Sequence, residues 1–365
     1  MTVVNCDFWR GKRVFVTGHT GFMGGWLTVV LGELGARVIG YALEPPTTPC
    51  FFDAVGLSAL LDEDTRADVR DLAKLSAVIR AHEPEIIFHL AAQPLVREAL
   101  RQPVETFDVN VMGTVKLLEA ARKVDSVRTV IVVTTDKVYE NLELDWEFRE
   151  NDRLGGREPY GVSKAAAELV VDAYRQSYLA PGQVGVATVR AGNIIGGGDW
   201  AAERLVPDIV RAFSAGATLA IRHPAATRPW QHVLEPIRGC LMLAEALSND
   251  PARFAGGWNF GAARDDQRPV SWIVEYCARQ WGEGARWKVD SGVHSYEAQR
   301  LGLTSSKAEL QLGWRPVWRL ETALDHTLHW YRAMIDGRDM LKLTQTQVHE
   351  AMPVAPEGLL LRSAQ

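Results

Sequence analysis

A glycine-rich turn near the start of the chain limits the available folds more than any other feature. Residues Thr17–Gly24 read TGHTGFMG, a G-x-x-G-x-x-G spacing. The apolar, β-branched run Arg13–Thr17 precedes this turn, and Gly25–Leu34 follows it with apolar residues at helical spacing. A glycine-rich turn between a strand and a helix lets the backbone approach a pyrophosphate and points free N–H groups at it. The pattern predicts a dinucleotide-binding site.

Strands and helices alternate through the rest of the first half. We expect strands at 37–41, 85–90, 129–134 and 184–190, and helices at 71–82, 109–123 and 159–178. Because these strands are apolar throughout, they belong to a parallel sheet covered on both faces. We therefore predict an α/β fold with a Rossmann-type doubly wound parallel sheet in residues 1–190. A smaller C-terminal substrate-binding lobe is expected at 191–340, with chain crossings left open, and a C-terminal tail at 341–365.

Composition and charge argue against several classes of protein. The 365 residues carry a formal net charge of -5, which does not favour nucleic-acid binding. No apolar stretch has the length of a membrane span, so no membrane partner is expected. The four cysteines are widely separated and no residues show metal-ligand spacing, so we expect free thiols and no metal. These features indicate a cytoplasmic enzyme or binding protein.

Tyr160 and Lys164 stand four residues apart near the start of a predicted helix, so they share one face. A phenol is a poor base near neutrality because its ordinary pKa is about 10. A nearby ammonium lowers that pKa by stabilising the phenolate. Such a pair can remove a hydroxyl proton while hydride leaves the adjoining carbon.

The segment Thr134–Tyr139 reads TTDKVY and closes the strongest strand, where sites of open α/β sheets lie. Alone, Asp136 and Lys137 read as a solvated charge pair. With the glycine turn, the L-A-A segment at 90–92, the N-x-x-G-T segment at 110–114 and the Tyr/Lys pair, the sequence resembles the extended short-chain dehydrogenase/reductase family. Its 4,6-dehydratases carry T-D-E at this position, or T-D-K in the CDP-glucose branch.

The resemblance to this dehydratase branch extends to about Trp330. Further matching segments are Ala92–Arg97, Thr134–Asn141, Arg190–Asn193, Gly196–Trp200 and Arg228–Val233. The chain departs from the branch pattern at Gly161–Val162 and at Gln299–Thr304. The second departure falls in a stretch that borders the nucleotide pocket in relatives, so it puts the identity of the nucleotide and sugar in doubt.

The expected cofactor is NAD, with NADP not excluded. The place after the second strand, where a carboxylate normally holds the ribose, is taken by Tyr41, Ala42 and Leu43, and Glu44 is a weak substitute. Asp68 is a candidate contact to the adenine, whereas Asp71 better fits a helix N-cap. The cofactor-binding residues that we expect are Gly18, His19, Gly21, Phe22, Met23, Gly24, Asp68, Val69, Leu90, Ala91, Ala92, Asn110, Thr134, Tyr160 and Lys164.

The resemblance also implies a role for each catalytic residue. Tyr160 is the base at C4 of the sugar, Lys164 tunes it and holds the ribose, and Thr135 binds the C4 oxygen. Asp136 is then the acid at C6, and Lys137 handles the C5 proton. These last two roles require a protonated Asp136 and a neutral Lys137, which a dry site favours.

The implied substrate is a nucleotide sugar, with CDP-glucose favoured. The expected substrate-binding residues are Gln93, Asn193, Trp200, Arg204, Arg228, Gln231 and His232. Arginine suits a diphosphate because its planar fork makes two parallel hydrogen bonds. Taken one at a time, the aromatic members of this set fit core residues better than ligand contacts.

Three alternatives stay open at this level. A 4-epimerase or a decarboxylase of the same fold would also oxidise C4, although Asp136 and Lys137 argue against the epimerase. A non-catalytic dinucleotide-sensing regulator would normally lack the Tyr160–Lys164 pair. We also expect a homodimer, because Val104–Lys123 and Tyr160–Tyr178 carry apolar residues on more than one face. In relatives, two such helices from each subunit form a four-helix interface.

Overall fold

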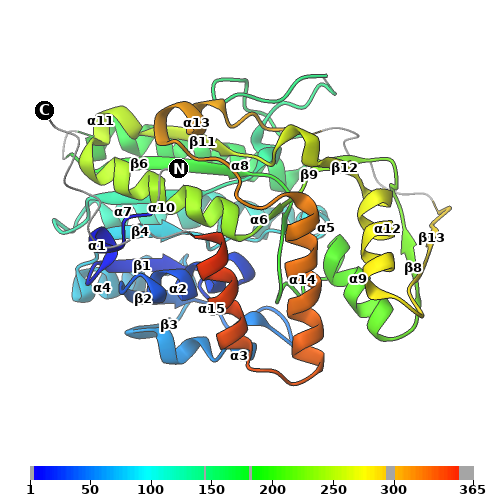
Figure 1. Cartoon of the computed structure of the whole chain (residues 1–365). Helices are drawn as coiled ribbons and strands as arrows, with labels where there is room; N and C mark the ends of the chain where they lie inside the picture. The colour runs from blue at the N-terminus through cyan, green and yellow to red at the C-terminus, as the bar shows by residue number, and fades with distance from the viewer. Residues whose placement is uncertain (1–3, 144, 181–182, 293–300, 353–365) are drawn as a thin grey trace, which may run out of the picture.

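The computed structural model describes residues 4–143, 145–180, 183–292 and 301–352. A parallel sheet of seven strands forms its centre, in the order β11-β6-β5-β4-β1-β2-β3 (Figure 1). These strands are β1 Arg13–Thr17, β2 Arg37–Ala42, β3 Glu63–Arg66, β4 Ile86–His89, β5 Thr129–Val133, β6 Gly185–Ala191 and β11 Gly256–Phe260. The prediction of a doubly wound parallel sheet is confirmed.

The sheet is covered on both faces because consecutive residues of each strand point to opposite sides. In β1, Val14 and Val16 enter one hydrophobic cluster, and Phe15 enters the other. The first cluster includes side chains of α2, α10, α14 and α15, which cross the near face in Figure 1, and the second those of α4, α7 and α8. The helices of these two layers are α2 Phe22–Glu33, α4 Leu72–His82, α7 Gly113–Ala121, α8 Pro159–Tyr174, α10 Leu234–Asn249, α14 Leu320–Ile335 and α15 Met340–Ala351.

Parallel register brings the carboxyl ends of neighbouring strands to one edge. Thr17 pairs with His89, and Val133 pairs with Val189. The strand order reverses beside β1, which neighbours both β2 and β4, so a topological switch point lies there. Ligands of open α/β sheets bind outside the carboxyl edge at such a point.

The second half of the chain builds a smaller lobe and also returns to the sheet. The lobe contains three two-stranded ladders, β7 with β10, β8 with β13 and β9 with β12, and lies to the right in Figure 1. Its elements are β7 Ile194–Ile195, α9 Leu205–Ser214, β8 Thr218–Ile221, β9 Thr227–Pro229, β10 Gln231–His232, β12 Gln267–Pro269, α12 Val270–Trp281 and β13 Arg286–Val289. By contrast, β11 pairs with β6, and α10 packs on β5 and β6. A boundary at residue 190 therefore does not separate the sheet from the lobe.

Three further segments differ from the expectations. Residues 341–351, which we assigned to a tail, lie in α15 because Met340, Val348 and Ala351 are buried at helical spacing. The expected helix 109–123 is divided, with a π-helical turn at Asp108–Met112 between α6 Pro103–Phe107 and α7. The expected helix 159–178 ends as α8 at Tyr174 and continues as a π-helical turn, Arg175–Leu179.

None of the helices in the described part of the chain has both the length and the apolar character required to cross a bilayer. The same part of the chain has all four cysteines as free thiols, as expected.

Candidate active site

The glycine turn is compact in a way that only glycine permits. Gly18 has a φ of +77°, and a Cβ there would lie 2.7 Å from the Ala91 nitrogen. A Cβ on Gly24 would lie 2.2 Å from the Gly18 carbonyl oxygen. Helix α2 begins directly after Gly21, and no side chain caps its first N–H groups. This uncapped N-terminus, at the carboxyl edge of β1, fits the pyrophosphate of a dinucleotide.

His19 lies in this turn, but its side chain points into the protein. The ring is fully buried, its Nε2 lies 2.8 Å from Asp64 Oδ1, and it packs over Gly40. Burial lowers the pKa of His19, although the contact with Asp64 opposes this. The side chain therefore supports the turn from beneath, and the residue presents its backbone to the outer side.

The expected adenine contacts are partly engaged within the protein. The Asp68 carboxylate accepts a hydrogen bond from Arg70 Nη2 at 2.6 Å, and this pairing lowers the pKa of Asp68. Asp71 caps α4 by accepting from the Lys74 backbone N–H, as predicted. Glu44 is exposed and lies 3.4 Å from Arg66, so no buried carboxylate follows β2.

The strand ends beside the turn are joined by buried hydroxyl groups. Thr17 Oγ1 lies 2.7 Å from His89 Nδ1 and also accepts from the Leu90 and Ala91 N–H groups, each at 3.2 Å. Burial lowers the pKa of His89 to about 3, so the ring is neutral. These bonds hold the Leu90–Ala92 segment against the glycine turn.

Asn110 occupies the π-helical turn and connects two predicted site segments. Its Oδ1 accepts from the Gln93 N–H at 2.8 Å, and its Nδ2 donates to Ser163 Oγ at 2.9 Å. The side-chain amide of Gln93 bonds to Thr106 and to the Leu95 N–H. Wide turns of this kind are frequent at functional sites. The π-helical turn places Asn110 so that its side chain reaches both the loop after β4 and α8.

The acid/base candidates lie together at the end of β5. Asp136 is buried, and its Oδ1 accepts from Thr135 Oγ1 at 3.0 Å, whereas its Oδ2 has no partner among the described residues. Burial raises the pKa of Asp136 despite the opposing charges of Lys137 and Arg228. This shift of the pKa is in the direction that the role of an acid requires.

Tyr160 lies across from this group at the start of α8, where Glu158 caps the helix. Burial raises the pKa of Tyr160 to about 12, and the Thr135 side chain and the Arg204 charge oppose this rise. We expected Lys164 to lower this pKa. Instead, Lys164 Nζ donates to the Val133 carbonyl oxygen at 3.0 Å, and burial dominates at the phenol. Burial also lowers the pKa of Lys164 to about 8.

The expected substrate residues divide into two groups. Arg204 approaches Tyr160 and is held by Asp199 Oδ2 at 2.9 Å, and the buried Arg228 approaches Asp136. Gln231 donates to the Phe260 carbonyl oxygen, which leaves its buried Oε1 without a partner in the described chain. Arg204 and Arg228 therefore bring positive charge to the site, and Gln231 keeps a buried acceptor without a partner among the described residues.

In the other group, His232 and Trp200 pack against aromatic rings, and Asn193 bonds through its backbone. His232 is fully buried, accepts from the Leu234 N–H, and meets the Trp318 ring edge-on at 4.8 Å. Burial lowers its pKa to about 3. Trp200 packs edge-on against Tyr331, and Asn193 supports β10 through its carbonyl oxygen, which accepts from the Gln231 N–H. His232 is thus buried among aromatic neighbours, and its Nε2 has no partner among the described residues.

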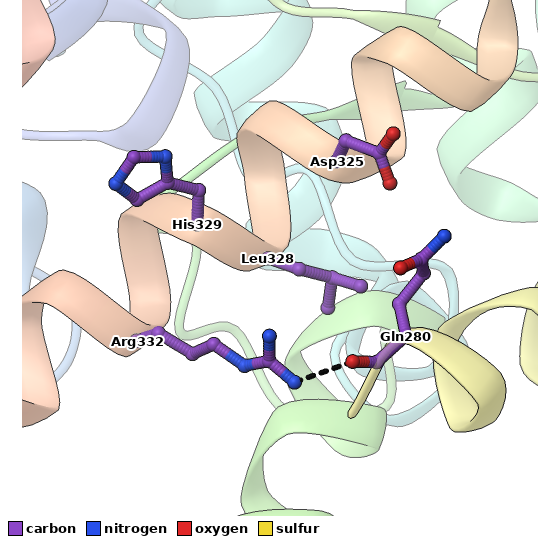
Figure 2. Close-up of a pocket in the computed structure, with 5 residues that line it drawn as sticks. All are labelled: Gln280, Asp325, Leu328, His329 and Arg332. Atoms are coloured by element: carbon purple, nitrogen blue, oxygen red, sulfur yellow. Dashed lines mark hydrogen bonds between the residues drawn. The ribbon is translucent and has the colours of Figure 1, made fainter. Parts of the chain in front are cut away.

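A cavity of about 340 Å³ lies elsewhere, between α12 and α14. Figure 2 shows Leu328 and Arg332 of α14 pointing toward Gln280 of α12, and Arg332 Nη2 donates to the Gln280 carbonyl oxygen at 2.5 Å. Asp325 and His329 complete the lining. None of these residues belongs to the predicted site.

Sequence reasoning missed a buried ion pair behind the site. Arg190 on β6 and Glu168 on α8 lie 2.8 Å apart. Their signal was present in the sequence, since Glu168 follows Lys164 by one helical turn and Arg190 stands in an apolar strand. A charged residue that a strand buries normally requires a partner.

Comparisons with known proteins agree with this geometry. The sequence model of the GDP-mannose 4,6 dehydratase family matches residues 15–327. A CDP-glucose 4,6-dehydratase of Salmonella typhimurium is 47% identical over 355 residues, which are 96% of this chain and 99% of that protein. A dTDP-glucose 4,6-dehydratase of Xanthomonas campestris pv. campestris is 26% identical, over 87% of this chain and 92% of that protein.

Solved structures show the same fold. A dTDP-glucose 4,6-dehydratase of Bacillus anthracis, solved in complex with NAD, superposes with a TM-score of 0.74 at 22% identity, over 91% of this chain and all of that one. A UDP-glucose 4-epimerase of Thermotoga maritima superposes with a TM-score of 0.75 at 21% identity, over 88% of this chain and 99% of that one.

Proposed function

Because the chain belongs to the GDP-mannose 4,6-dehydratase family of nucleotide-sugar enzymes, we propose that it converts CDP-glucose to CDP-4-dehydro-6-deoxy-glucose and water. The identity to the Salmonella enzyme, over nearly the whole of both chains, supports this choice of nucleotide. The observation that carries the chemistry is Asp136, a buried carboxyl group with a raised pKa and an unpartnered oxygen among the described residues, beside Lys137.

The order of steps follows from the chemistry of the sugar. The C5–H of a hexose is not acidic, so water cannot be eliminated directly across C5 and C6. A ketone at C4 makes that proton acidic, and the C6 hydroxyl can then leave. The enone that results accepts hydride at C6.

We infer that the cofactor is NAD, which supplies the hydride acceptor when bound. The Bacillus anthracis dehydratase of the same fold is a complex with NAD. The glycine turn and the uncapped start of α2 would hold the pyrophosphate, and Lys164 would hold the ribose. A pyrophosphate fits this turn because Gly18 and Gly24 pack closely on the backbone of Ala91 and Gly18, which keeps the turn tight, and because no side chain caps the first N–H groups of α2.

Tyr160 and Thr135 act at C4 in this scheme. Thr135 orients the C4 oxygen, and Tyr160 takes its proton. Because burial raises the pKa of Tyr160, the phenolate needs stabilisation by positive charge, which Arg204 supplies. Positioned acid–base groups of this kind typically contribute about 10²–10⁴-fold to a rate.

Asp136 and Lys137 act at C6 and C5. The protonated Asp136 donates to the departing hydroxyl, and Lys137 removes the C5 proton. A 4-epimerase needs neither Asp136 nor Lys137. A non-catalytic regulator needs neither of these two residues nor Tyr160. The buried Asp136, whose pKa is raised, therefore favours the dehydratase over both.

The nucleotide comparison tests the substrate. Purified protein is incubated with NAD and CDP-, dTDP-, UDP- or GDP-glucose, and 4-keto-6-deoxy product is followed by its absorbance in alkali and by NMR. We expect CDP-glucose to give the highest kcat/KM. A higher value with any other nucleotide would reassign the substrate, and epimerised product would reassign the reaction.

Substitutions at Asp136 and Lys137 should separate the two halves of the reaction. Asp136→Asn and Lys137→Ala should still reduce bound cofactor with CDP-glucose but form at least about 10²-fold less 6-deoxy product. Exchange of the C5 proton with deuterated solvent should fall most in Lys137→Ala. Tyr160→Phe is the control, since it should abolish cofactor reduction. Equal loss of cofactor reduction in all three variants would contradict the division of roles.

We also propose a homodimer built on α5 Val96–Arg101, α6 and α8. Exposed apolar side chains follow these helices and the π-helical turn between α6 and α7, namely Leu100, Val104, Phe107, Met112, Val162 and Leu169. Val104 is 82% exposed and Leu169 is 63% exposed, which is unusual for residues that gather on neighbouring helices. A second copy packed on this face would bury them.

The solution mass tests the dimer. Light scattering at micromolar concentration should give twice the chain mass, and Val104→Asp with Leu169→Asp should give the monomer mass. Leu310→Asp is the matched control, because Leu310 is 85% exposed but lies on α13 Ser306–Leu312, away from this face. A monomeric wild type would refute the proposal.

A further inference from the structure

The buried ion pair behind the site joins the sheet to the catalytic helix. Arg190 of β6 donates to Glu168 of α8 through Nε at 2.9 Å and through Nη2 at 2.8 Å. The two side chains are only 5% and 4% exposed. An ion pair of two parallel hydrogen bonds in so dry a place is strongly directional.

Each partner also binds the segment that carries the acid/base residues. Glu168 Oε1 accepts from Thr134 Oγ1 at 2.6 Å, and its Oε2 accepts from Thr188 Oγ1 at 2.6 Å. Arg190 Nη1 donates to the Tyr139 hydroxyl at 2.7 Å. Thr134 and Tyr139 stand on either side of Thr135–Val138, so the pair holds both ends of that segment.

Lys164 adds a further attachment one helical turn away. Its Nζ donates to the Val133 carbonyl oxygen at 3.0 Å. Val133 is the last residue of β5, and Thr134 follows it. These two consecutive residues are therefore bound by Lys164 and Glu168, residues i and i+4 of α8. The spacing between Tyr160 and Asp136 is set by these bonds, because Tyr160 lies one turn earlier on the same helix.

Glu168 is also the carboxylate whose charge acts on the pKa of Lys164. Its negative charge opposes the fall that burial imposes on the pKa of Lys164. From the sheet side, His89 of β4 faces Lys164 and is neutral. Arg190 of β6 faces Glu168, and Tyr160 lies on Lys164's own helix. Glu168 is thus the group whose charge favours the ammonium form.

We propose that Glu168 is a positioning residue for the dehydration, which fixes the Thr135–Val138 segment against Tyr160 and supplies the negative charge that Lys164 faces. Arg190 holds Glu168 in place by donating to both of its carboxylate oxygens. The proposal deepens the proposed function and rests on it, because Lys164 matters through the ribose that it would hold and the Thr135–Val138 segment matters through the acid/base residues that it carries.

Three variants separate this role from a merely structural one. Glu168→Gln removes the negative charge, Arg190→Gln removes the positive charge, and the double variant leaves a neutral pair of amides. Both single variants leave an uncompensated buried charge, so both should lower the melting temperature. The double variant should regain part of that loss, which keeps a folded protein available for the measurements.

The alkaline limb of the pH profile of cofactor reduction, measured in single turnovers with CDP-glucose, gives the first readout. Glu168→Gln and the double variant should move its midpoint down by about one pH unit, because Lys164 loses its proton more easily without the carboxylate. Arg190→Gln should not move it down. Equal loss of rate in both single variants with an unchanged midpoint would overturn the proposal and leave a purely structural ion pair.

Direct titration of Lys164 gives the second readout and requires no turnover. The ¹³Cε resonance of Lys164, assigned by its absence in Lys164→Met, should titrate at lower pH in Glu168→Gln than in wild type or Arg190→Gln. If wild type reduces no cofactor with any nucleotide glucose, the proposed function fails while this titration still decides the charge effect. An identical titration in Glu168→Gln and wild type would refute the inference.

Discussion

The attachment of the end of β5 to α8 is the interaction on which the rest of the site depends. Helix α8 carries Tyr160, Lys164 and Glu168 at four-residue intervals, so all three lie on one face. The last two hold Val133 and Thr134. Tyr160 then lies beside Thr135 and Asp136, which directly follow Thr134 in the chain. Parallel register brings the glycine turn to the same edge, so the expected cofactor site and the acid/base residues meet there.

Burial at this edge gives the ionisable groups their chemical character. It raises the pKa of Asp136 and of Tyr160 and lowers that of Lys164. The same desolvation therefore suits Asp136 to its proposed role as an acid and makes a Tyr160 phenolate strongly basic. Positive charge must stabilise the buried phenolate, and Arg204 lies near the phenol. The charge of Glu168 acts on Lys164. Desolvation thus raises the pKa of the carboxyl and phenol groups and lowers that of the amine at the same edge of the sheet.

The sequence was sufficient for the sheet and for the residues with local signals. The strands 13–17, 37–41, 85–90, 129–134 and 184–190 appear with ends shifted by at most one residue, because apolar runs bounded by turns are a strong signal. It was insufficient where a role depends on distant neighbours. The burial of His232, for example, depends on Trp318, which comes from much later in the chain. Edge strands β3 and β11 were missed because Glu63–Arg66 is polar and Gly256–Phe260 begins with two glycines.

In the proposed reaction, hydride removed from C4 is held at this site and returned to C6 of the same sugar. Turnover of CDP-[4-²H]glucose in ordinary water, with the product analysed by NMR and mass spectrometry, tests this transfer. We expect deuterium in the C6 methyl group and a solvent proton at C5. Deuterium that is lost to solvent, or that is found again at C4, would contradict it.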